Sequence, residues 1–195
     1  MTVRQVDQAN SLIAAMHSLD TRAREIERTT DRASFDWQPG GGAWTVGQIF
    51  DHLCVVNDDY VAVLRRLLAN PAPAPHRDGV NAVWRPSFAG RLLTRSMVSP
   101  RKLVTPSKWQ PAPEARDNVI GEFLDRQHEL ERLIERSMDR EWRRVRLSSP
   151  VSRLIRMNLG DAFTVIVRHA ERHFRQIDSR LAELEAAHVH GVAPL

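Results

Sequence analysis

The strongest constraint on the fold is the spacing of apolar residues, which recur at intervals of three and four along several long segments. In residues 46–68 this stripe consists of Val46, Ile49, Leu53, Val56, Tyr60, Leu64 and Leu67. Residues 159–184 carry a second stripe, made of Leu159, Phe163, Ile166, Ala170, Phe174, Ile177, Leu181 and Leu184. Such spacing places apolar side chains on one face of an α-helix, so both segments are predicted to be amphipathic helices packed against other helices.

Two further segments, residues 4–30 and 114–138, have the same helical spacing. We therefore expect four long helices, at about residues 4–30, 46–68, 114–138 and 160–187, with a short turn of helix after Pro150 before the last one. A chain of 195 residues with 42% hydrophobic residues can bury a core of its own. The sequence thus predicts an all-α fold and one domain over residues 1–195.

The start of the second helix is marked by a capping-box pattern. The Thr45 hydroxyl can accept a hydrogen bond from the backbone of Gln48, whose side chain can reach back to Thr45. Residues 70–113 contain eight prolines, which exclude a long continuous helix. This crossover is expected to contain one short helix around residues 88–97. Its length leaves three interpretations open, namely a lid, an interface or an insertion without a function of its own.

Three histidines stand out as a candidate metal site. His169 and His173 are four residues apart, so on a helix they project from the same side, one turn from each other. His52 lies far upstream, and like the other two it flanks the apolar stripe of its helix. Flanking positions face the groove between packed helices, where bundle proteins commonly bind metals. Imidazole binds zinc, nickel, iron and copper, so the residue type does not select the ion. The alternative to a metal site is that the three residues are solvated or core histidines.

Cys54 is the only cysteine, so an internal disulfide is excluded. Two residues along a helix turn the chain by about 200°, which points Cys54 away from His52 and predicts a small buried apolar side chain. The sequence contains no long apolar run, and its amino terminus does not begin like a secretory signal. We therefore expect a cytoplasmic protein that does not bind a membrane.

The net charge is +4 and the pI is about 10.1, and the basic residues are almost all arginines. They form two clusters, Arg85, Arg91, Arg95 and Arg101, and then Arg140, Arg143, Arg144 and Arg146. Neither cluster is interleaved with aromatic residues or placed in a DNA-binding motif. We interpret both as solvated surface faces and expect no nucleic-acid partner.

Two segments together resemble the paired motif of the DinB/YfiT-like superfamily. They are residues 44–53, WTVGQIFDHL, and residues 169–177, HAERHFRQI. The resemblance extends over the helical framework and implies a four-helix bundle of the up-down-down-up type, with a long crossover between its second and third helices, and a homodimer. It also implies that His52, His169 and His173 bind a divalent transition metal, nickel or zinc.

Four other residues are candidates for orienting the ligands or contacting a substrate. Gln176 lies one turn after His173, and Arg172, in the same motif, could bind an anionic substrate or an acidic residue across the bundle. Gln48 lies one turn before His52, and Asp59 lies two turns after it. Each could orient His52, and the alternative is a capping or solvent-facing role.

Three nitrogen ligands leave coordination positions open for water, a thiolate or a carbonyl oxygen. The resembled family includes metal-dependent hydrolases and enzymes that use a low-molecular-weight thiol as cosubstrate in transferase or isomerase reactions. We expect one of these activities on a small-molecule substrate, beside an apolar pocket lined by Trp84, Phe88 or Trp109. A metalloprotease is disfavoured because Ala170 follows His169 where that motif has glutamate. A non-catalytic metal protein and a helical interaction module with a basic surface remain alternatives.

Overall fold

The computed structural model describes residues 2–70, 82–99 and 104–189 and shows a predominantly helical protein, as predicted. Its long helices are α1 (Gln5–Thr29), α3 (Val46–Leu68), α5 (Val119–Arg136) and α6 (Leu159–Val189). Two shorter ones are α2 (Arg32–Phe35) and α4 (Phe88–Val98), and a 3-10 turn, η2, spans Ser107–Trp109. None of the described helices is both long enough and apolar enough to cross a membrane.

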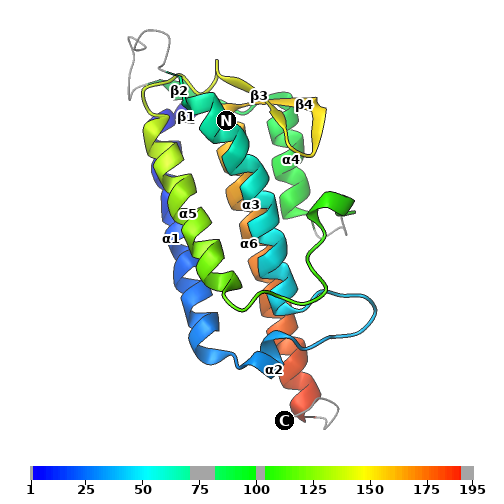
Figure 1. Cartoon of the computed structure of the whole chain (residues 1–195). Coiled ribbons are helices and arrows are strands. Elements are labelled where there is room, and N and C mark those ends of the chain that lie inside the picture. Colours follow the sequence, from blue (N-terminus) through cyan, green and yellow to red (C-terminus); the bar gives the residue numbers. More distant parts are fainter. Residues whose placement is uncertain (1, 71–81, 100–103, 190–195) are drawn as a thin grey trace.

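The four long helices pack side by side (Figure 1), and their buried apolar residues form two clusters. Both α1 and α3 contact α5 and α6, and α4 packs against the outside of α6. Hydrogen bonds fix the directions, since Gln5 at the start of α1 binds the carbonyl oxygen of Arg140 beyond the end of α5. Arg140 in turn binds the carbonyl oxygen of Leu67 at the end of α3, and Gln8 binds Thr164 near the start of α6. Hence α1 and α6 run in one direction, and α3 and α5 in the other.

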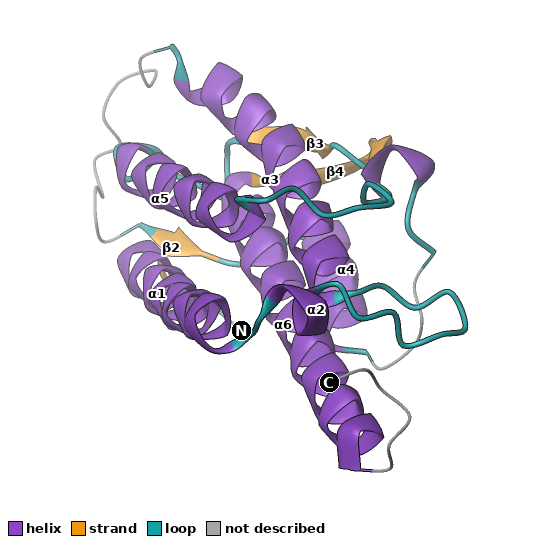
Figure 2. Ribbon diagram, turned by 60° about the horizontal axis from the view of Figure 1, so that its bottom comes forward, coloured by secondary structure: helices purple, strands orange, loops and turns teal. Residues whose placement is uncertain are grey.

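Two short antiparallel pairs of strands lie at the end of the bundle where α6 starts (Figure 1). Strand β1 (Val3–Arg4) pairs with β2 (Val83–Trp84), which joins the start of α1 to the segment before α4. Strand β3 (Arg146–Ser149) pairs with β4 (Ser152–Asn158). Figure 2, an oblique view from the opposite end of the molecule, shows α6 between α1 and α4.

The β3–β4 hairpin corrects the prediction of a helical turn after Pro150. Leu147 and Met157 face each other across the hairpin, and both are buried in the core. Arg153 and Arg156 of β4 are exposed. Arg156 and Met157 are adjacent in β4 and face solvent and core respectively, as the two faces of a strand allow. The hairpin thus buries Leu147 and Met157 together.

Helix α5 starts later than residue 114, where the sequence analysis placed it. Buried Asp51 of α3 accepts hydrogen bonds from the backbone amide of Ala112 and from Nε of Arg116. These bonds hold Ala112 and Arg116 against α3 in a bent, non-helical segment, and the helix begins at Val119.

The capping box at the start of α3 is confirmed. The backbone amide of Gln48 donates to Oγ1 of Thr45 at 3.1 Å, and the backbone amide of Thr45 donates to Oε1 of Gln48 at 3.1 Å. These bonds satisfy amides that the first turn of a helix otherwise leaves without partners.

We expect Thr45→Ala to lower the free energy of unfolding by about 1 kcal/mol, because the hydroxyl acceptor for the Gln48 amide is lost. Thr45→Ser should retain most of the stability. The measurement is urea unfolding monitored by circular dichroism. Thr29→Ala is the control, because it removes an exposed hydroxyl that only donates to the carbonyl oxygen of Glu25 within α1 and caps no helix amide. An equal effect of Thr45→Ala and Thr29→Ala would contradict this role of the cap.

Candidate metal centre

The structure brings His52, His169 and His173 together in one cluster. His52 lies in the second turn of α3, and the other two lie one turn apart on α6, which packs against α3. Nε2 of His169 is 3.2 Å from Nε2 of His52 and 3.1 Å from Nε2 of His173. One ligand atom from each of the three residues lies within 4.8 Å of the others.

This nitrogen spacing suits a metal ion. Zinc binds imidazole nitrogens at about 2.0–2.1 Å, so a tetrahedral ion holds two such nitrogens about 3.3 Å apart. The two Nε2 pairs above are close to this value. The cluster therefore could hold a metal without rearrangement of the helices.

The outer nitrogens of two rings are held by hydrogen bonds that fix their protons. Nδ1 of His52 lies 2.7 Å from the carbonyl oxygen of Trp109, which can only accept, so Nδ1 carries the proton. Nδ1 of His173 lies 3.0 Å from Oε1 of Gln176 and donates in the same way. Both inner Nε2 atoms therefore present lone pairs to the centre of the cluster. This arrangement is typical of histidines that bind metals.

His169 differs from the other two histidines. It is partly exposed, whereas His52 and His173 are buried. Its Nδ1 is buried and has no hydrogen-bond partner in the described part of the chain. The third ring thus lacks the outer hydrogen bond of the other two and makes its polar contacts through Nε2, and it is the least buried of the three.

Burial and mutual repulsion keep the three imidazoles neutral. Burial lowers the pKa of His173 to about 3, helped by the nearby His52. Burial also lowers the pKa of His169 well below its ordinary value, and it lowers that of His52. Neutral imidazole is the form that binds metals, so the site is in its ligating state at neutral pH.

Trp44 covers one side of the cluster. Its ring centroid is 4.9 Å from that of His52 and 6.2 Å from that of His173. The preceding Gly40, Gly41 and Gly42 all have positive φ, a conformation that side chains disfavour, so the turn leading to Trp44 depends on glycine. The sequence analysis assigned no role at the cluster to Trp44 or to the carbonyl group of Trp109, because neither role has a sequence signature.

Of the four candidate neighbours, Gln176 contacts a histidine of the cluster directly, as described above. Asp59 contacts Nζ of Lys108 and accepts a hydrogen bond from Nε1 of Trp109 at 2.8 Å, so it holds the segment whose carbonyl binds His52. Gln48 serves the capping box and donates to the carbonyl oxygen of Pro113. Arg172 donates to the carbonyl oxygens of Ser96 and Ser99, which ties the end of α4 to α6.

The predicted apolar pocket is only partly at this site. Trp109 lies beside His52, and it is buried. Trp84 and Phe88 instead line another cavity, of about 680 Å³, between α1, α4 and α6. Among the described residues, the cluster contains histidines and no carboxylate, and Glu171, two residues after His169, pairs with Arg168.

Cys54 is fully buried, as predicted, and its Sγ faces the carbonyl oxygen of Val119 instead of the histidines. Burial raises its thiol pKa to about 12. Because thiolate is the reactive form, we expect iodoacetamide at about pH 8 to modify Cys54 at least about a hundredfold more slowly in the native protein than in the urea-unfolded chain. Mass spectrometry over time measures this. Comparable rates in the two states would contradict the buried position.

Comparison with protein families gives one match, in which the model of the DinB superfamily covers residues 12–177. This range includes all three histidines. Comparisons with curated proteins and with solved structures gave no match.

Proposed function

The chain belongs to the DinB superfamily, and on that premise we propose that it is a metal-dependent enzyme. His52, His169 and His173 hold the metal, a divalent transition ion, nickel or zinc. The observation that carries the proposal is the convergence of one ligand nitrogen from each of the three rings. In His52 and His173, the other ring nitrogen, Nδ1, already forms a hydrogen bond. A set of three imidazoles without sulfur or carboxylate ligands favours these ions over magnesium or calcium.

A catalytic role is favoured over a structural one by the number of ligands. Structural zinc sites usually have four protein ligands, whereas three leave a position open. The core also does not need an ion to fill it, because apolar side chains pack directly beside the cluster. Phe174, which directly follows His173, is almost fully buried, and so is Phe50, two residues before His52. The partly exposed side of His169 gives a small molecule a route to the open position.

The chemistry that we favour is transfer of a low-molecular-weight thiol to a small-molecule substrate. When bound by three neutral ligands, a divalent ion keeps its full charge and lowers the pKa of a thiol. This activation needs no protein base, which fits a cluster without a carboxylate among the described residues. Arg172, on the same turn of α6, adds positive charge that favours an anionic sulfur.

The protein's own groups have defined tasks in this proposal. The Trp109 carbonyl and the Gln176 amide keep protons on the outer nitrogens of His52 and His173 and so orient the rings. Trp44 excludes water from one side of the cluster. Hydrolysis at the same site is the second candidate, because the lowered pKa of a water molecule would serve it equally.

We expect His52→Ala, His169→Ala and His173→Ala each to reduce the bound metal to less than about a tenth of an equivalent, because the two imidazoles that remain bind these ions weakly. Gln176→Ala should weaken binding only about 10- to 100-fold, since it removes the partner of a ligand and leaves the ligands in place. Untagged protein analysed by mass spectrometry for metals, followed by competitive titration with zinc and nickel, measures both effects.

His128→Ala, an exposed histidine of α5, and Gln8→Ala, an amide at the other end of the bundle, are matched controls and should keep full loading. Wild-type protein that neither carries nor takes up a transition metal would refute the proposal and leave an interaction module. Unchanged loading in the His169→Ala variant would refute the ligand assignment.

Turnover separates an enzyme from a metal-storage or metal-sensing protein. We expect the metal-loaded protein to consume thiols such as cysteine or glutathione in the presence of an electrophilic acceptor, and the His52→Ala variant to lose at least 99% (~) of this activity. Loss of free thiol measures it, and ester and amide substrates test hydrolysis in parallel. Full metal loading without turnover in either screen would favour a non-catalytic protein.

A further inference from the structure

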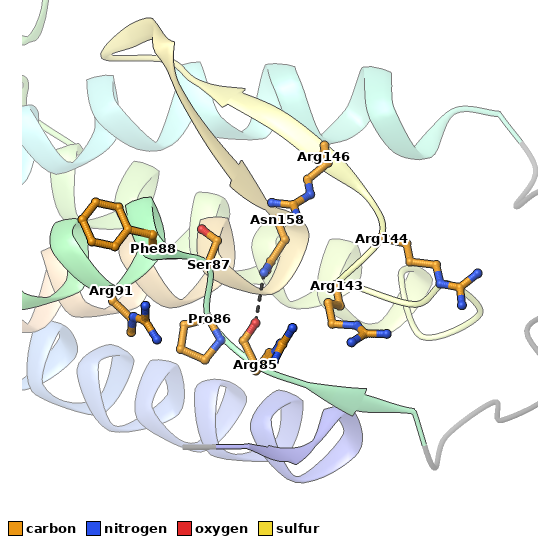
Figure 3. A pocket seen from close by; sticks show the side chains of 9 residues that line it. All are labelled: Arg85, Pro86, Ser87, Phe88, Arg91, Arg143, Arg144, Arg146 and Asn158. Atoms are coloured by element: carbon orange, nitrogen blue, oxygen red, sulfur yellow. Dashed lines mark hydrogen bonds between the residues drawn. The ribbon is translucent and has the colours of Figure 1, made fainter.

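The two arginine clusters, which are far apart in sequence, face a single groove at the end of the bundle where α6 starts (Figure 3). The groove has a volume of about 770 Å³, within the range of small-molecule sites. Five of the residues that line it are arginines, namely Arg85, Arg91, Arg143, Arg144 and Arg146. The sequence analysis interpreted these clusters as solvated faces, but the structure shows that they share one concave site.

The positive charge of the groove is only partly balanced. None of its lining residues is acidic. Arg143 and Arg144 both pair with Glu141. Within the described residues, Arg85, Arg91 and Arg146 form no ion pair, although all three are exposed and able to bind an anion. Arginine presents a planar fork that matches phosphate and carboxylate oxygens, so the groove suits a ligand with several negative charges.

One buried asparagine organises the floor of the groove. Nδ2 of Asn158 donates to the carbonyl oxygen of Arg85 at 3.1 Å, as drawn in Figure 3. Its Oδ1 accepts from the indole of Trp84 at 2.9 Å, and its backbone pairs with that of Arg146 across the hairpin. The backbones of Arg85 and Arg146 are therefore fixed before any ligand arrives, which lowers the entropic cost of binding.

An aromatic ring stands at one side of the groove. Phe88 is 76% exposed, which is unusual for a ring of its size, and it lies in the first turn of α4. A flat ring beside a cationic groove can stack on a base or a similar ring system while the arginines bind phosphates.

We propose that this groove binds a nucleoside polyphosphate, with its phosphates on Arg85, Arg91 and Arg146 and its base against Phe88. A nucleic-acid strand fits less well, because strand-binding surfaces use successive aromatic rings. The groove has one. Its volume of about 770 Å³ is that of a small-molecule site, which suits one nucleotide better than an extended polymer.

This site is separate from the histidine cluster. Asn158 directly precedes α6, and His169 lies ten residues after Leu159, the first residue of that helix, a rise of about 15 Å along the helix. Nucleotide binding is thus independent of the proposed metal function, and either can fail without the other.

Isothermal titration calorimetry with ATP, on chelator-treated full-length protein at low salt, tests the proposal. We expect the double variant Arg85→Ala/Arg146→Ala to bind ATP about a hundredfold more weakly, because two charge-assisted contacts are lost at about tenfold each. Arg28→Ala/Arg24→Ala, which removes the same charge from exposed positions on α1, should bind within twofold (~) of wild type.

Phe88→Ala separates the ring from the phosphates. It should weaken ATP binding about tenfold and leave inorganic tripolyphosphate binding unchanged, since only ATP carries a base. His169→Ala should bind ATP as wild type does, which distinguishes this site from the metal centre. The proposal is overturned if wild-type protein gives no heat with ATP, if both double variants weaken binding equally, or if a single-stranded RNA oligonucleotide binds more tightly than ATP and its binding tracks Arg85 and Arg146.

Discussion

The packing of α3 against α6 is the constraint on which the histidine cluster depends. Phe50 of α3, Phe123 of α5 and Phe174 of α6 form a trio in which every pair of ring centroids is 5.6 Å apart. Phe50 lies two residues before His52, and Phe174 directly follows His173. Because protein interiors are close-packed, neither helix can rotate or slide without opening a cavity in this trio. The positions of the imidazoles therefore follow from burial of the neighbouring aromatic rings, and the helices need no ion to align them.

The second contribution comes from the crossover, whose described part crosses α3 beside the cluster. Lys108 and Trp109 are held by Asp59, and the carbonyl oxygen of Trp109 then binds His52. That single acceptor decides which nitrogen of His52 carries the proton and which one faces the other histidines. The crossover, for which the sequence left open a lid, an interface or an insertion, thus takes part in setting the chemistry of the site. Residues 71–81 and 100–103 of the predicted crossover lie outside the described residues.

Helix α4 extends from the arginine groove towards the histidine cluster along the side of α6. At its start, the backbone amide of Ser87 donates to the buried carboxylate of Asp161. At the other end of α4, the carbonyl oxygens of Ser96 and Ser99 accept hydrogen bonds from Arg172, which lies between His169 and His173 on α6. One helix therefore carries both the anchors of α4 and two of the three histidines. The surface groove and the internal cluster are built on the same element but use different chemistry, cationic and exposed in the first case, neutral and largely buried in the second.

The sequence by itself determined what depends on local spacing. Apolar periodicity gave the long helices, with the bounds of α3 as predicted, and the four-residue step of His169 and His173 set their common side. The capping box and the burial of Cys54 also follow from local patterns. Only the tertiary structure decided which distant groups meet. The Trp109 carbonyl on His52, the late start of α5 imposed by Asp51, the β3–β4 hairpin and the meeting of two arginine clusters all depend on contacts between segments far apart in the chain. Such contacts leave no periodic signal, because their partners are chosen by packing and by the need of buried polar groups for hydrogen bonds.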